Sequence, residues 1–165
     1  MGFIFVGTYM GYAVGSAPVI SYHYGAGNKD ELKNLFKRSL TIIIVSSVVM
    51  TLIAEIIAGY LAGIFVSYDN NLLELTTEAI RIYAVSYLIS GVNIFASSFF
   101  TALNNGVVSA VISFMRMFVF QIVMILLLPV VLGISGIWTA VIAAEVLSVV
   151  ISVMFLVKNR KKYSY

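Results

Sequence analysis

The sequence predicts an all-α membrane protein with five transmembrane helices. Hydrophobic residues make up 61% of the 165 positions and charged residues only 10%, whereas soluble domains average roughly 45–50% apolar and about 25% charged residues. Eight of the ten Lys and Arg residues lie between or after the apolar runs, each of which is long enough for a hydrocarbon core that needs about 20 residues. Polar and apolar residues do not alternate as in a barrel, so the runs are predicted helices. The five runs span residues 1–24, 39–66, 79–103, 106–132 and 134–157.

The charges of the connecting segments predict the orientation. Residues 25–38 and the tail 158–165 are rich in Lys and Arg, whereas residues 67–78 carry three acidic residues and no cation. The positive-inside rule therefore places the C-terminus in the cytoplasm of a multi-pass protein of the cytoplasmic membrane. Five spans then put the N-terminus outside, directly on an apolar run, and we expect the chain to belong to something longer.

The same observations exclude several other functions. The basic pI of about 9.2 follows from membrane topology, so no nucleic-acid partner is expected. The chain has no cysteine and a single histidine, and it carries none of the common hydrolase, nucleotide-binding or metalloprotease motifs. We therefore expect no enzyme activity, no cofactor and no metal site.

The first two predicted helices offer a packing stripe and an embedded acid. Gly7, Gly11 and Gly15 recur at a spacing of four in the first helix, and such small-residue stripes let another helix approach closely. Glu55 lies close to the middle of the second helix. A carboxylate at mid-membrane costs about 2.5–3.5 kcal/mol on insertion scales. Glu55 therefore handles an ion or substrate, is paired with a cation elsewhere, or points into a missing neighbour.

The third predicted helix carries a continuous polar face. Its polar side chains recur at steps of three or four residues, which places them on one side of a helix. Such a face lines either a cavity or a neighbouring helix, and Ser hydroxyls also bond back to their own backbone. The candidate cavity-lining residues are Tyr83, Ser86, Ser90 and Asn93.

The last two predicted helices contain one embedded charge each. Arg116 lies roughly ten residues inside the fourth helix, and Glu145 lies near the middle of the fifth. Arg116 either pairs with Glu145 or extends its side chain toward the cytoplasm. Together with Glu55, Glu145 makes the handling of H+ or Na+ a reasonable expectation.

Several motifs along the chain resemble the multidrug and toxic compound extrusion (MATE) family of transporters. They are SAPVISYHYGAGNK at residues 16–29, FVSYD at 65–69, RIY at 81–83, SFMR at 113–116, LP at 128–129, GISGIW at 133–138 and AE at 144–145. The resemblance implies helices eight to twelve, most of the C-terminal lobe, of a twelve-helix bundle with two lobes and alternating access. One branch of the family has an acid on the tenth helix, where this chain has none, so the coupling ion stays open between H+ and Na+.

The resemblance implies cation-coupled efflux of amphipathic organic cations or drugs. Glu55, Glu145 and Arg116 are then the ion-coupling or substrate candidates, and the expected partners are organic cation substrates, the lipid bilayer, and a missing N-terminal lobe or partner subunit. One alternative is a lipid-linked oligosaccharide flippase of the same superfamily, which needs a more cationic cavity than Arg116 alone provides. Another is a membrane subunit or remnant that does not transport.

Overall fold

The computed structural model describes residues 2–165, so Met1, the first residue of the first predicted span, lies outside the described residues. The described chain is helical, without strands, and five of its helical segments are long and apolar enough to cross a membrane, which confirms the predicted fold class. The segments α4, η1 and α5 follow one another without a break and form a single span from Gly106 to Leu132. The elements are α1 (Gly2–Gly25), α2 (Lys29–Val66), α3 (Asn70–Ala102), α4 (Gly106–Phe114), the π-helical η1 (Met115–Phe120), α5 (Gln121–Leu132) and α6 (Ile134–Tyr163).

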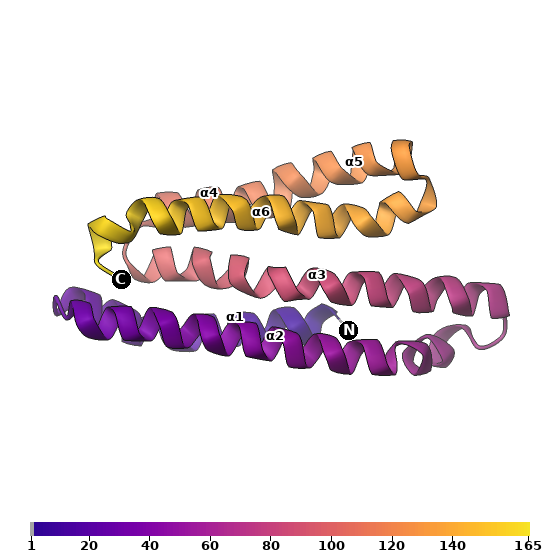
Figure 1. The fold of residues 1–165 in the computed structure, drawn as a ribbon, viewed down its shortest axis with the longest axis horizontal. Coiled ribbons are helices and arrows are strands. Elements are labelled where there is room, and N and C mark those ends of the chain that lie inside the picture. Colours follow the sequence, from indigo (N-terminus) through magenta and orange to yellow (C-terminus); the bar gives the residue numbers. More distant parts are fainter. Residues whose placement is uncertain (1) are drawn as a thin grey trace.

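Helix α3 forms the centre of the bundle. It contacts α1 and α2 on one side and α4 and α6 on the other, and α6 in turn packs on η1 and α5 (Figure 1). Half of the apolar window of α3 is buried, compared with 6% for the span Gly106–Leu132. Ser86, Ser90 and Asn93 of α3 are buried, whereas most of the α4–η1–α5 span faces outward.

The helices extend beyond the apolar runs into segments that the sequence analysis treated as connectors. Helix α2 begins at Lys29, where the Asn28 side chain accepts a hydrogen bond from the Glu31 amide at 3.1 Å. Helix α3 begins at Asn70 after an Asp69 cap that accepts bonds from two backbone amides. Capping residues satisfy the free amides of a helix start, so these helices begin among charged residues in the polar connectors.

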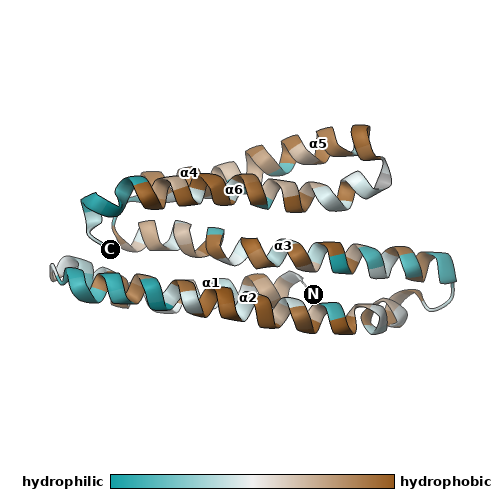
Figure 2. Ribbon diagram, viewed as in Figure 1, coloured by the Kyte–Doolittle hydropathy of each residue, from teal (hydrophilic) through white to brown (hydrophobic). Residues whose placement is uncertain are grey.

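Figure 2 shows hydrophilic residues at both ends of the bundle, and the sequence shows that the two ends differ in charge. We call the end where α2 begins and α6 ends the basic end, because it carries residues 29–38 and 158–162. The opposite end, where α2 meets α3, is the acidic end and carries Asp69, Glu74 and Glu78. The tight turn at Asn104 and Asn105 lies at the basic end, and Asn104 has a φ of 57°.

One close approach of helices occurs at Gly91, which is not part of the predicted stripe. A Cβ atom on Gly91 of α3 would lie 2.9 Å from the Ser47 Oγ and 3.0 Å from the Ile43 Cγ2. In contrast, Gly7, Gly11 and Gly15 are exposed, and nothing lies within 4 Å of a Cβ at any of them. Packing at this stripe therefore has no partner among the described residues and stays a prediction for a contact outside them.

Candidate functional site

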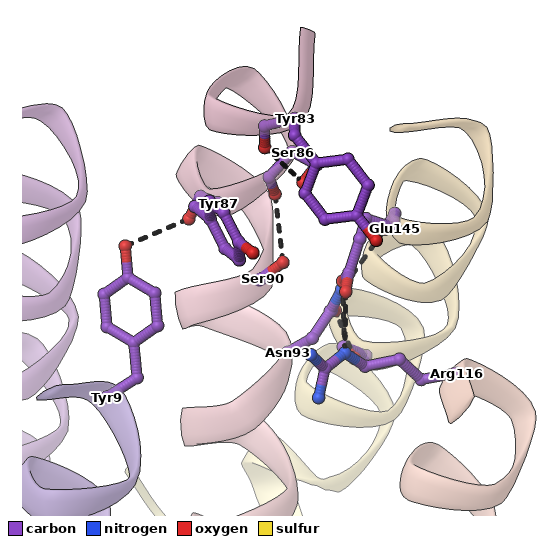
Figure 3. Close-up of polar contacts among 9 residues, drawn as sticks. Tyr9, Tyr83, Ser86, Tyr87, Ser90, Asn93, Arg116 and Glu145 are labelled. Atoms are coloured by element: carbon purple, nitrogen blue, oxygen red, sulfur yellow. Dashed lines mark hydrogen bonds and ion pairs between the residues drawn. The ribbon is translucent and has the colours of Figure 1, made fainter. Parts of the chain in front are cut away.

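A buried polar cluster joins three elements near the middle of the bundle. The Nε of Arg116 in η1 donates to both carboxylate oxygens of Glu145 in α6, at 3.0 and 3.1 Å. The Nδ2 of Asn93 in α3 donates to the Glu145 Oε2 at 2.8 Å and to its backbone oxygen at 3.2 Å. Ser152 completes the cluster by donating its hydroxyl to the Asn93 Oδ1 at 2.9 Å. Figure 3 shows how Arg116 and Asn93 converge on the carboxylate.

Burial makes these contacts energetically important. The side chain of Glu145 is 9% exposed and that of Arg116 18%, and Asn93 is fully buried. Glu145 also lies about 17 Å along α6 from its first residue, given a rise of about 1.5 Å per residue. A carboxylate at this depth needs a counter-charge and donors to remain ionised. Of the two sequence-based alternatives for Arg116, the structure therefore shows the pairing with Glu145.

The π-helical segment η1 positions the arginine. Arg116 is its second residue, and the α-helical pattern resumes at Gln121. A π-helical turn holds more residues than an α-helical one and changes which side chains face a neighbour, and such segments are frequent at functional sites. The fourth span therefore departs from regular helix geometry where its one charged side chain meets α6.

The polar face of α3 borders a central cavity of about 240 Å³. Tyr83, Ser86 and Ser90 line it together with the ion pair. The hydroxyls of Ser86 and Ser90 also donate to carbonyls of their own helix, at 2.7 and 3.0 Å. These serines therefore combine both sequence-based alternatives, because their hydroxyls bond to backbone while their side chains border a cavity.

Two larger cavities continue the central one along α3. The acidic-end cavity, of about 610 Å³, shares Val6, Tyr83 and Tyr87 with it. The basic-end cavity, of about 430 Å³, shares Val6, Arg116 and Met117. We call the three together the α3 groove, which has α3 as its floor, α1 along one side and the α4–η1–α5 span with α6 along the other. The ion pair therefore lies at the midpoint of the groove.

The other embedded carboxylate lies apart from this site. Glu55 of α2 contacts Arg81 of α3 at 3.7 Å, and the two side chains are 35% and 58% exposed. Neither residue lines the α3 groove. The structure thus gives Glu55 the paired alternative and does not bring it to Glu145.

Other groove residues escaped the sequence analysis. Gln121 and Tyr87 line the central cavity, and the Tyr87 ring stacks on Phe5 with centroids 4.3 Å apart. A single amide or tyrosine in an apolar run shows no periodicity. Only the rotation and packing of the helices therefore reveal that Gln121 and Tyr87 line the cavity. Among residues 2–165, no group of three or more His, Cys, Asp or Glu side chains is placed to hold a metal ion.

Two comparisons with known proteins find matches to this chain. A family model described as MatE matches residues 1–127. The crystal structure of the Vibrio cholerae MATE transporter VcmN in its bent form matches with a TM-score of 0.87 at 17% sequence identity. The match covers 98% of this chain and 36% of the transporter chain, so this chain spans about a third of its length. At this identity the likeness shows the fold. No curated protein gives a significant match.

Proposed function

Because the chain belongs to the MatE family, we propose that it forms part of a cation-coupled exporter of amphipathic organic cations. The observation that carries this proposal is the Glu145 carboxylate, buried at mid-membrane and bonded to the Arg116 side chain beside an aromatic cavity. In this proposal the chain forms one half of the transport site. The remaining lobe of a longer protein, or a partner subunit, provides the other half.

The cavities suit a molecule with a flat apolar body and one positive charge. Phe3, Tyr83, Tyr87 and Trp138 line the acidic-end cavity, and its volume of about 610 Å³ lies within the range of small-molecule sites. The two tyrosines also border the central cavity that contains Glu145. Aromatic faces attract organic cations, so a substrate ring in the first cavity would leave its charge near the carboxylate.

Arg116 makes the binding of other cations exclusive. Both Glu145 oxygens accept bonds from the Arg116 Nε. A substrate cation therefore competes with Arg116 for the Glu145 carboxylate. The coupling ion, H+ or Na+, competes for the same carboxylate, so substrate and coupling ion exclude each other. Mutually exclusive binding is the requirement for antiport, because each ligand favours release of the other.

The charge distribution supports an orientation for this transport. The basic end of the bundle faces the cytoplasm, because short Lys- and Arg-rich segments stay on that side. The C-terminus is then cytoplasmic in the plasma membrane, and efflux runs from the basic end to the acidic end. The flippase alternative receives less support, since Arg116 is the one cation that the groove linings contain and Glu145 holds its Nε.

A pair of matched variants in the complete native protein tests the proposal. We expect Glu145→Gln to abolish efflux of a cationic dye such as ethidium from energised cells, because the neutral amide cannot exchange cations. Glu55→Gln, an equivalent change in the other embedded carboxylate, should retain efflux. Full efflux by Glu145→Gln, at equal expression, would refute the assignment of Glu145, and efflux lost only in Glu55→Gln would move the site to α2.

A further inference from the structure

We propose that a chain of four hydroxyl groups between α3 and α4 conducts protons between Glu145 and the basic end of the bundle. The chain consists of Ser113, Ser97, Ser109 and Thr101 in that order. This inference rests on the proposed cation-coupled transport, and it assigns H+ as the coupling ion and gives its cytoplasmic route.

The four hydroxyls form an unbroken hydrogen-bonded series. The Ser97 Oγ lies 2.7 Å from the Ser113 Oγ and 2.9 Å from the Ser109 Oγ. The Ser109 Oγ lies 2.7 Å from the Thr101 Oγ1. All three separations are within the usual range for hydroxyl hydrogen bonds. The series therefore continues through four side chains from two different helices.

The series can carry hydrogen bonds of either polarity, which proton conduction requires. In each of the three contacts, either oxygen can act as the donor. In one arrangement Ser113 donates to Ser97, which donates to Ser109, which donates to Thr101. The Thr101 hydroxyl then donates to the Ser97 backbone oxygen at 3.2 Å. Rotation of all four O–H bonds reverses the direction, because a hydroxyl is both a donor and an acceptor.

The basic-end cavity joins this series to the ion pair. Asn93, Ser97, Thr101, Ser113 and Arg116 all line it, so the cluster around Glu145 and the hydroxyl series border the same space of about 430 Å³. Ser113 precedes Arg116 by three residues, or about 4.5 Å along a helix. A space of this size with several polar groups admits water. This water carries the proton from Glu145 to Ser113, where the hydrogen-bonded series of hydroxyls begins.

The far end of the series reaches the surface at the basic end. Thr101 is exposed and lies one residue before the end of α3. Asn93, at the other end of the route, lies about 14 Å from the last residue of α3 at 1.5 Å per residue. The hydroxyl series thus covers the part of the bundle between Asn93 and the basic end of α3.

The proton transfer leaves every hydroxyl neutral, and rotation of the four O–H bonds then restores the original polarity of the series. The O–H bond of protonated Glu145 breaks, and a water in the basic-end cavity takes the proton. Ser113 accepts a proton on its oxygen and releases its own to Ser97, and the same exchange continues through Ser109 to Thr101, which passes a proton to bulk water. The carboxylate regains the Arg116 contact. The oxygens lie too close together for a sodium ion to fit between them, so the series is selective for protons.

The groups that face Glu145 come from three elements. Arg116 comes from η1, Asn93, Tyr83 and Tyr87 come from α3, and Gln121 comes from α5. Helix α4 contributes no charged or titratable side chain. Arg116 is therefore the one cation at the carboxylate among these elements.

The test measures proton movement and dye movement separately in vesicles that contain the complete native protein. A pH-sensitive dye in the lumen reports proton flux, and ethidium reports transport driven by a pH gradient or exchanged at equal pH. We expect Ser97→Ala to slow dye-coupled proton flux at least about tenfold while ethidium–ethidium exchange stays normal. Ser97→Thr, which keeps a hydroxyl, should restore the flux.

Two further variants keep the result interpretable. Ser113→Ala interrupts the series at its first residue, so it decides the question if Ser97→Ala fails to fold. Ser21→Ala is the matched control, because the Ser21 Oγ also links two helices by donating to the Ala102 oxygen at 2.8 Å but lies outside the groove linings. It should keep coupled flux.

Each failure points to a different conclusion. Normal coupled flux in Ser97→Ala and Ser113→Ala, or an equal loss in Ser21→Ala, overturns the hydroxyl route and leaves the exporter proposal intact. A wild-type protein that exports ethidium on a sodium gradient without moving protons also overturns the route. A wild-type protein that neither exports nor exchanges ethidium overturns the proposed function together with the route.

Discussion

Removing the arginine of the buried ion pair provides the most sensitive test of the site's energetics. In Arg116→Met the Glu145 side chain, 9% exposed, loses its counter-charge and keeps Asn93 as its side-chain donor. Leaving one member of a buried ion pair uncompensated costs about 3–5 kcal/mol. We therefore expect the free energy of unfolding of the complete protein to fall by about that amount.

Neutralising the other partner, Glu145, should cost less, because the two side chains have different surroundings. Glu145→Gln leaves Arg116, 18% exposed and bordering two cavities that admit water. The Gln side-chain oxygen can still accept the bond from Asn93, so the expected loss is that of a charged hydrogen bond, about 1.5–3 kcal/mol. The double variant contains no unpaired charge, and its loss should be smaller than the sum of the single losses by at least about 2 kcal/mol.

Unfolding by titration with SDS in mixed micelles measures these differences. Arg81→Met is the matched control, since the Arg81–Glu55 contact is longer, at 3.7 Å, and its side chains are 58% and 35% exposed. Exposed pairs of this kind contribute at most about 1 kcal/mol. If Arg116→Met lowers the free energy of unfolding no more than Arg81→Met does, or if the double variant is additive, the pair does not stabilise the bundle and the reasoning is refuted.

Two further predictions concern packing and the basic end. Gly91→Ala should destabilise the protein by about 1–3 kcal/mol because its Cβ would meet neighbouring side chains at 2.9–3.1 Å. Gly63→Ala in α2, where nothing lies within 4 Å of a Cβ atom, should gain up to about 1 kcal/mol of helix propensity. SDS titration measures both, and equal losses would contradict the packing argument. Burial, and then the neighbouring Tyr163, raises the pKa of the Tyr165 phenol above its usual value, so the neutral phenol is the form that the folded state favours. The contribution of Tyr165 to stability should therefore be full below about pH 10 and fall above it. Tyr165→Phe, which loses the bond from the phenol to the Leu156 oxygen, should remove that pH dependence at a cost of about 1 kcal/mol at neutral pH. A wild-type thermal midpoint that is flat above pH 10 would contradict this prediction.

Hydropathy and helix capping determined the spans of this protein before any tertiary contact is considered. The five apolar runs coincide with the cores of the observed helices, because the cost of placing an unbonded backbone in lipid depends on the local sequence alone. The ends of α2 and α3 were predictable in principle from Asn28 and Asp69, which are good capping residues. Hydropathy alone instead predicts helix ends where the apolar runs end, although a helix continues outside the membrane as long as its amides are satisfied.

The tertiary structure decided which embedded charges meet. The sequence identified Glu55, Glu145 and Arg116 as unusual, but their partners depend on how each helix is rotated about its axis and on the π-helical turn at η1. Arg116 meets Glu145 across 29 positions of sequence, whereas Glu55 meets Arg81 on a different side of α3.

The same dependence explains the glycines and the hydroxyls. The regular stripe of Gly7, Gly11 and Gly15 faces outward, and the solitary Gly91 is where α1 and α2 approach α3. Periodicity places residues on one face of a helix, but it does not say which helix covers that face. Insertion into the membrane is a property of each segment, so the sequence determined it, whereas cavities and ion pairs belong to several segments together and only their packing decided them.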